Sequence, residues 1–133
     1  MNVISQRHAV NASEEKIFAS LSDCRNFEKF LPAEMKDVEV TAETCKFTIP
    51  GLTTLDLKIT EKTEFSKVAF QATNDKNIPI NLIFHIINEN NANNIEVEID
   101  VDIPSFLATM VKKPLQNAVD MIAEKVPQAI ENN

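Results

Sequence analysis

Residues 104–130, "PSFLATMVKKPLQNAVDMIAEKVPQAI", have apolar residues at spacings of three and four, which predicts one amphipathic helix. Its apolar face carries Leu107, Val111, Leu115, Ala118, Ile122 and Val126. A helix of this kind contains about 27 residues and is roughly 40 Å long, enough to cross a whole domain. Pro104 suits the helix start, and Pro114 removes a backbone hydrogen bond in the middle, where we expect a kink.

Upstream of this helix, the hydrophobic period drops to two, which is typical of β-strands. The segments with this period are "VEVTAETCKFTI" (38–49), "LTTLDLKIT" (52–60), "KVAFQAT" (67–73), "IPINLIFHII" (78–87) and "IEVEIDVDI" (95–103). Turn residues separate them at "PG", "NDKN" and "NENNANN". Because no helical pattern intervenes, the sequence predicts an antiparallel meander with one face buried.

The N-terminal part of the chain predicts one strand and then two short helices. "NVISQRHAV" (2–10) alternates weakly, with Ile4, Gln6, His8 and Val10 on one side. A helix is expected to begin near residue 12, capped either by Asn11 with Glu14 or by Ser13. The expected buried stripe is Ile17, Phe18 and Leu21. Asp23 is placed to cap a second short helix, which carries Phe27, Phe30 and Leu31 and ends before Pro32.

Composition limits the function classes. A chain of 133 residues with 44% hydrophobic content is enough for one core, so residues 1–133 are predicted to form a single domain. The net charge of -7 disfavours nucleic acid as a partner. No apolar run reaches the length of a membrane span and the polar start lacks a signal peptide pattern, so we expect no membrane insertion and a cytoplasmic protein. Gly51 is the only glycine, which argues against phosphate-binding loops.

The order strand, helix pair, antiparallel strands and long C-terminal helix is that of the α+β helix-grip fold. The stretches "AVNASEEKIFASLSDCRNFEKFLP" (9–32), "CKFTIPGLTTLDLKI" (45–59) and "VKKPLQNAVDMI" (111–122) resemble the SRPBCC superfamily of START-related and polyketide-cyclase-like proteins. The similarity is to its small bacterial members of unassigned function. This resemblance implies a curved antiparallel sheet of about six or seven strands wrapped around the C-terminal helix.

The resemblance also implies an apolar cavity between the concave sheet face and that helix, used in the superfamily for lipids, polyketides and other hydrophobic ligands. Phe27, Phe30 and Leu31 would close one end of it, against the helix that carries Met110 and Met121. Flexible methionines around Pro114 would allow that helix to act as a gate. The candidate ligand-binding residues are Phe27, Phe30, Leu31, Phe47, Leu57, Phe70, Leu82, Phe84, Ile99, Met110, Pro114 and Met121.

Two alternatives stay open beside non-covalent binding of a small hydrophobic molecule. A cyclase- or hydrolase-like enzyme would need a titratable group inside the cavity, which the inward rows of these strands do not supply. A ligand-free interaction module, monomeric or homodimeric, would use Ile83 and Ile87, which point outward if Leu82 and Phe84 point inward. A filled core would also use the same Phe and Met residues as a cavity.

Ordinary structural roles account for the polar residues that could otherwise carry chemistry. His8 and His85 lie on different strands, which predicts no metal site and no acid–base pair. Asp100 and Asp102 continue an outward, solvated strand face. Cys24 and Cys45 fit neither a disulfide framework nor a zinc site, so we expect free, buried thiols. Lys112 and Lys113 are placed either on a plain helix surface or near an acidic ligand group at the cavity mouth. We expect no cofactor and assign no catalytic residue.

Overall fold

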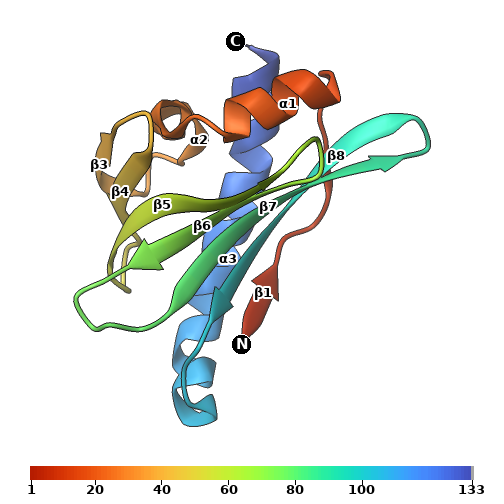
Figure 1. Cartoon of the computed structure of the whole chain (residues 1–133). Helices are drawn as coiled ribbons and strands as arrows, with labels where there is room; N and C mark the ends of the chain where they lie inside the picture. The colour runs from red at the N-terminus through yellow and green to blue at the C-terminus, as the bar shows by residue number, and fades with distance from the viewer. Residues whose placement is uncertain (133) are drawn as a thin grey trace.

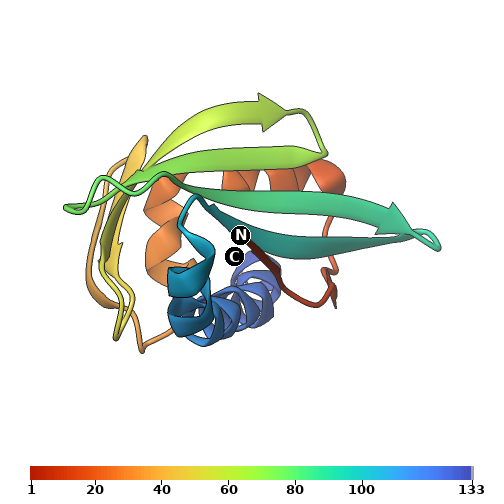
Figure 2. The ribbon, with the colours of Figure 1, turned by 90° about the horizontal axis from the view of Figure 1, so that it is seen from below.

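The computed structural model describes residues 1–132, in which a curved antiparallel sheet wraps around one long helix (Figure 1). Within this range the sheet has eight strands in the order β1-β8-β7-β6-β5-β4-β3, and β2 also pairs with β8. The strands are β1 (Asn2–Ile4), β2 (His8–Ala9), β3 (Lys36–Val40), β4 (Thr44–Thr48), β5 (Thr54–Thr63), β6 (Lys67–Thr73), β7 (Ile80–Glu89) and β8 (Ala92–Val101). Figure 2 shows how the sheet curves around the helix.

The structure confirms the helix predicted from the period of the C-terminal segment, which is α3 (Ser105–Glu131). Its C-terminal part is buried against the sheet through Leu115, Ala118, Ile122 and Val126. Its first turns extend past most of the strands, at the lower end in Figure 1, so Leu107 stays exposed. Helix α3 runs through Pro114 and through a second proline, Pro127, which is buried.

The predicted helix pair is present and covers the opposite end of the sheet. It consists of α1 (Glu14–Leu21), the 3-10 turn η1 (Cys24–Asn26) and α2 (Phe27–Phe30). Of the two possible caps for α1, the structure uses Ser13, whose Oγ accepts a hydrogen bond from the Lys16 N–H at 3.1 Å. The Asp23 carboxylate caps η1 by accepting from the Arg25 N–H at 3.0 Å, as the sequence predicts.

The segment 38–49 is a hairpin, which makes seven strands from the six segments with a strand period, and the division of the first strand into β1 and β2 adds the eighth. Strands β3 and β4 pair with each other across a turn at Thr41. The Thr41 Oγ1 accepts hydrogen bonds from the Thr44 N–H at 3.0 Å and from the Glu43 N–H at 3.3 Å. A threonine hydroxyl thus stabilises a turn that contains no Gly, Pro, Asn or Asp, so the sequence carried only a weak turn signal.

The N-terminal strand is interrupted, which corrects the predicted alternation of residues 2–10. Val3 and Ser5 are buried and Ile4 is 47% exposed, so the inward side is the opposite of the predicted one there. Inward alternation returns at Val10. The cause is Ser5, whose Oγ accepts from the Val97 N–H at 2.9 Å and takes the place of a backbone carbonyl in the ladder.

Three phenylalanines join the helix pair to the sheet. The rings of Phe27, Phe70 and Phe84 are fully buried and lie 5.2 to 5.9 Å apart between centroids, each pair close to perpendicular. Edge-to-face contacts of this kind stabilise by about 0.5–1.5 kcal/mol each beyond area burial. These three side chains, which we call the aromatic cluster, fill the space beneath α2.

We predict that Phe84→Ala lowers the free energy of unfolding by about 3–5 kcal/mol, because the cavity left by the ring is surrounded by packed side chains. Denaturant unfolding measures the loss. Phe106→Ala is the control, since Phe106 is 74% exposed and its truncation should change stability by less than about 0.5 kcal/mol. A loss below about 2 kcal/mol for Phe84→Ala would mean that the ring borders open space.

Candidate functional site

A cavity of about 90 Å³ lies beneath the N-terminal half of α3, at the end of the sheet away from α1 and α2. Figure 2 views the molecule from this end. The floor is buried and apolar, formed by Ile49, Leu55, Ile80, Val101 and Leu115. The apolar part of the rim is half-buried, formed by Leu52, Ile78, Ile103 and Val111. The cavity therefore opens to the surface through the strand connections and α3.

Tightly bonded turns hold this rim in place. In the β4–β5 turn, Gly51 has φ +78, a conformation that favours glycine, and the Ile49 N–H donates to the Thr53 carbonyl at 2.9 Å. In the β6–β7 connection, Asn74 Oδ1 accepts from the N–H groups of Lys76 at 3.0 Å and Ile78 at 3.3 Å. Asn74 Nδ2 also donates to the Ile78 carbonyl at 2.7 Å. Both connections are thus ordered by local bonds.

Two residues of the lining carry polar side chains, Thr53 and Lys76. The Thr53 hydroxyl donates to Asp75 Oδ1 at 3.3 Å. Asp75 itself lines a different hollow, on the side of Lys46 and Asp56, and not the cavity. The Lys76 side chain is exposed at the rim, and within residues 1–132 its ammonium has no hydrogen bond or ion pair. The cavity is therefore an apolar space with one cation at its edge.

The structure separates the twelve candidate ligand-binding residues into two groups. Nine are buried in the packed core: Phe27, Phe30, Leu31, Phe47, Leu57, Phe70, Leu82, Phe84 and Ile99. Of the other three, Met110 is 72% exposed and lies in the first turns of α3. Helix α2 lies beside the C-terminal half of α3, so its phenylalanines are not opposite Met110 as the sequence suggested. Pro114 and Met121 line a surface groove of about 380 Å³ together with Met35 and Lys113. In the described chain, none of the twelve lines the 90 Å³ cavity.

The residues that sequence reasoning missed had a recognisable signal. Leu52, Ile78 and Ile103 are apolar and lie in connections, where surface loops are ordinarily polar. Leu52 follows "PG", Ile78 follows "NDKN" and Ile103 precedes Pro104, and in the structure all three converge on one cavity. Lys76 lies in the same kind of connection, within "NDKN". Apolar residues at the ends of predicted strands were therefore a better indicator of the cavity than the middle of the strand faces.

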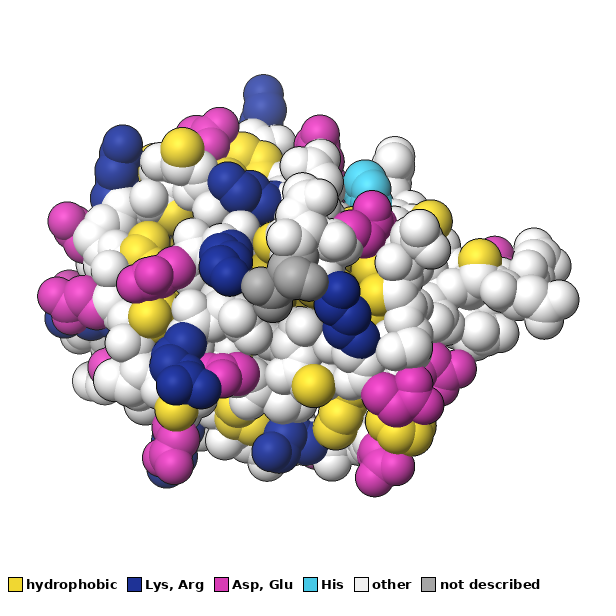
Figure 3. Space-filling model, turned by 90° about the horizontal axis from the view of Figure 1, so that it is seen from above, with side chains coloured by type: hydrophobic (Ala, Val, Ile, Leu, Met, Phe, Trp, Pro, Cys, Tyr) yellow, Lys and Arg dark blue, Asp and Glu magenta, His cyan; other side chains and the backbone are white. Residues whose placement is uncertain are grey.

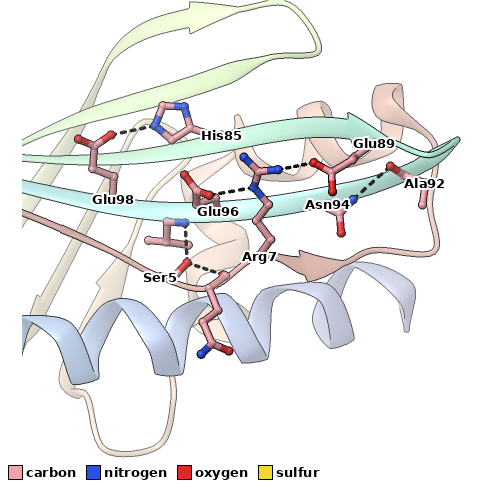
Figure 4. A network of polar contacts seen from close by, with 10 residues as sticks. Ser5, Arg7, His85, Glu89, Ala92, Asn94, Glu96 and Glu98 are labelled. Atoms are coloured by element: carbon pink, nitrogen blue, oxygen red, sulfur yellow. Dashed lines mark hydrogen bonds and ion pairs between the residues drawn. The ribbon is translucent and has the colours of Figure 1, made fainter.

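The polar residues on the outer face of the sheet form a structural network, shown in Figure 4. His85 Nε2 and Glu98 Oε1 lie 2.9 Å apart, on adjacent strands β7 and β8. The Arg7 guanidinium binds Glu96 at 3.1 Å and also pairs with Glu89. These contacts attach the N-terminal segment to the sheet on the side opposite the core. Among residues 1–132, no three His, Cys, Asp or Glu side chains are grouped as a metal site.

The thiols lie in the core and are poorly suited to nucleophilic chemistry. Cys24 and Cys45 are both fully buried and free. Burial raises the pKa of Cys24 to about 11, with a further contribution from Asp23. Burial also raises the pKa of Cys45 to about 12, and the neighbouring Cys24 adds to this shift. Both thiols are therefore protonated at neutral pH.

The structure shows where the outward isoleucines and the lysine pair of α3 lie. Ile83 and Ile87 point to the outer face and are half-buried, with Ile83 directly between Ala69 and Glu98 in register. Lys112 is exposed on α3 and does not line the cavity. Lys113 lies on the groove that contains Pro114. The basic residue at the cavity is thus Lys76 and neither of the two considered from sequence.

The end of the molecule that carries α1, α2 and the end of α3 offers no broad apolar surface. Figure 3 shows this face, on which apolar side chains appear as small separate areas between acidic and basic ones. None of the helices in residues 1–132 combines the length and the apolarity that a membrane span requires.

Known structures share this architecture, although no family model and no curated protein sequence matches the chain. A START superfamily protein from Mycobacterium smegmatis is 18% identical, with a TM-score of 0.72 over 98% of this chain and 97% of that one. The protein KanY is 9% identical, with a TM-score of 0.74 over 98% and 97%. The Aha1 dimer from Colwellia psychrerythraea is 20% identical, with a TM-score of 0.55 over 92% and 96%.

At these identities the likeness concerns the fold. The chain has the START-like helix-grip fold that the sequence predicted, with a curved antiparallel sheet and a long C-terminal helix. Side chains fill most of the space between the concave sheet face and α3 as one core. In this chain the aromatic cluster occupies part of that space, and the cavity under the first half of α3 remains.

We predict that neither thiol of the folded protein reacts with iodoacetamide at a measurable rate at pH 8. A thiol with a pKa near 11 is ionised in roughly one molecule in a thousand at that pH, and burial blocks access to the sulfur. Mass spectrometry counts the modified cysteines, with urea-unfolded protein as the control in which both react. Modification of the folded protein as fast as that of a free thiol would show a reactive cysteine.

Proposed function

We propose that this protein binds a small apolar molecule non-covalently in the cavity beneath the N-terminal half of α3. The observation that carries the proposal is the lining, which is apolar except for Thr53 and Lys76 and combines a buried floor with a half-buried rim. Ligand sites are typically concave, mostly apolar and provided with a few convergent polar groups. The START-like fold supports the same class of function.

The volume restricts the size of the ligand. A water molecule needs about 10–15 Å³ on the same scale, so a cavity of about 90 Å³ accommodates a short apolar chain as it stands. Pockets for drug-sized ligands are typically about 300–1,000 Å³. A larger ligand would therefore require the rim to move outward.

The first turns of α3 are the part of the rim that we propose moves. The N-cap residue Pro104 provides no side-chain hydrogen bond to the helix start. Pro114 has no N–H to donate to the carbonyl of Met110. Residues 105–113 are therefore joined to the rest of α3 by a weakened backbone ladder, and Phe106 and Met110 on this segment point to solvent. Outward motion would enlarge the cavity without disturbing the aromatic cluster.

Catalysis is the rival proposal, and the lining gives it less support. A cyclase or hydrolase needs an acid, a base or a nucleophile directed at the ligand. No Asp, Glu, His or Cys lines the cavity within the described residues. The Thr53 hydroxyl is engaged with Asp75 and the Lys76 amine is at the exposed rim. We therefore favour binding over a chemical step.

Self-association through the outer sheet face is a second candidate. It is supported by Ile83 and Ile87, which are half-buried there, and by Ile4, which is exposed. A protein of the same fold, the Aha1 protein of Colwellia psychrerythraea, has been solved as a dimer. This surface lies on the opposite side of the sheet from the cavity, so dimerisation and ligand binding are compatible.

We predict that Val111→Trp weakens binding of octan-1-ol by about tenfold or more, because an indole at this rim position fills the cavity. Amide chemical shifts in an NMR titration report the affinity. Met110→Trp is the matched control, since the adjacent side chain points to solvent, and it should leave the affinity within about twofold. Equal effects of the two variants, or no binding to the unmodified protein, would contradict the proposed site.

We also predict that the amides of residues 105–113 exchange with deuterium faster than those of residues 115–130, and that saturating octan-1-ol slows the first group. The expected difference follows from the missing backbone bond at Pro114 and from the buried face of the C-terminal half. Hydrogen exchange resolved by NMR measures both. If octan-1-ol binds and the exchange of residues 105–113 is unchanged, the first turns of α3 are not the moving part.

A further inference from the structure

The charge at the cavity is the reverse of the charge of the protein. The chain has a net charge of -7, with 20 acidic against 13 basic residues. Even so, the one charged residue among those lining the cavity in residues 1–132 is Lys76. Since charges are screened over about 8 Å at physiological salt, the group nearest the opening dominates what a ligand meets there. An acidic protein has thus placed a cation at its apolar cavity.

The turn that carries Lys76 fixes the position of its backbone. Asn74 accepts from the Lys76 N–H at 3.0 Å and bonds in both directions with Ile78, which closes the turn around Lys76. Asn77 has φ 54, a left-handed conformation that asparagine tolerates. The Asp102 N–H donates to the Pro79 carbonyl at 3.0 Å, which attaches the same connection to the end of β8. Lys76 therefore projects from an ordered part of the rim.

No carboxylate among residues 1–132 forms an ion pair with the Lys76 ammonium. Asp75, the adjacent acid, accepts from the Thr53 hydroxyl and faces the other hollow, which Lys46 and Asp56 also line. The Thr53 hydroxyl is in turn occupied by that bond. What remains at the cavity is a cation with three donors and no acceptor requirement of its own.

We propose that the ligand of this cavity is an amphiphile with an anionic group, a carboxylate or a phosphate, which the Lys76 ammonium binds at the rim while the apolar part lies on the buried floor. This inference rests on the proposed function and adds the chemical class of the ligand. Hydrogen bonds between an ammonium and a carboxylate are stronger than those to a neutral oxygen, so an anion is preferred over an alcohol of the same length.

A matched pair of ligands tests the anionic group. Octanoate and octan-1-ol have the same chain length and differ in the charge of the polar end, so their apolar burial is closely similar. At neutral pH and low salt, NMR titration should give an affinity for octanoate about two- to fivefold higher than for octan-1-ol, the size expected for an exposed ion pair. High salt should remove most of this preference.

Variants of Lys76 test whether this residue causes the preference for octanoate over octan-1-ol. Lys76→Ala should abolish the preference for octanoate over octan-1-ol, whereas Lys76→Arg should retain it. Lys112→Ala is the matched control, because Lys112 is also exposed and does not line the cavity, and it should behave as the unmodified protein. Both positions are exposed, so the three variants are expected to fold normally.

The outcomes separate the two proposals. Equal affinities for octanoate and octan-1-ol in the unmodified protein, or a preference that survives in Lys76→Ala, would overturn the anionic group and leave the apolar binding function in place. Binding of octan-1-ol without binding of octanoate would likewise overturn the anionic group and leave the apolar binding function in place. Binding of neither ligand would overturn the proposed function and this inference with it.

Discussion

The contact among Phe27, Phe70 and Phe84 is the constraint on which the rest of the arrangement depends. The helix-grip architecture brings the concave sheet face, the helix pair and α3 around one space, and a 133-residue chain must fill most of it to be stable. Here the three rings fill the half beneath α2, where their perpendicular packing connects α2 to strands β6 and β7. This half is a close-packed core, and Figure 3 shows its outer surface covered by mixed charges.

Because one half is filled, any binding space is moved to the other end of the sheet. There the strands end and give way to connections, and the walls are completed by side chains from turns and from the start of α3. Turns stabilised by Asn74 and by Gly51 supply a fixed part of the rim. In the proposed function, the first turns of α3, weakened at Pro114, supply the adjustable part. The proposal thus places a packed core and an adaptable opening at opposite ends of the sheet, which would separate stability from binding.

The candidate site was only partly readable from the sequence. The strand periods correctly identify Phe47, Leu57 and Phe84 as inward-facing, since all three are buried. Period alone does not distinguish a residue packed against another side chain from one that borders a cavity, because both positions favour the same residue types. Leu52 and Ile78 are the first residues of predicted strand segments, and they became lining residues only because three connections meet at one place.

The sequence by itself determined the fold class, the order of its elements and the buried faces of strands β4, β5, β6 and β8. These follow from local causes, namely hydrophobic period, capping by Ser13 and Asp23, and turn residues, each of which acts over a few neighbouring positions. Only the tertiary structure decided the interrupted first strand, the filling of one end by phenylalanines and the placement of Lys76 at an apolar cavity. Those features depend on contacts between residues far apart in the chain, such as Ser5 with Val97 or Phe27 with Phe84, and no local pattern encodes the distance between them.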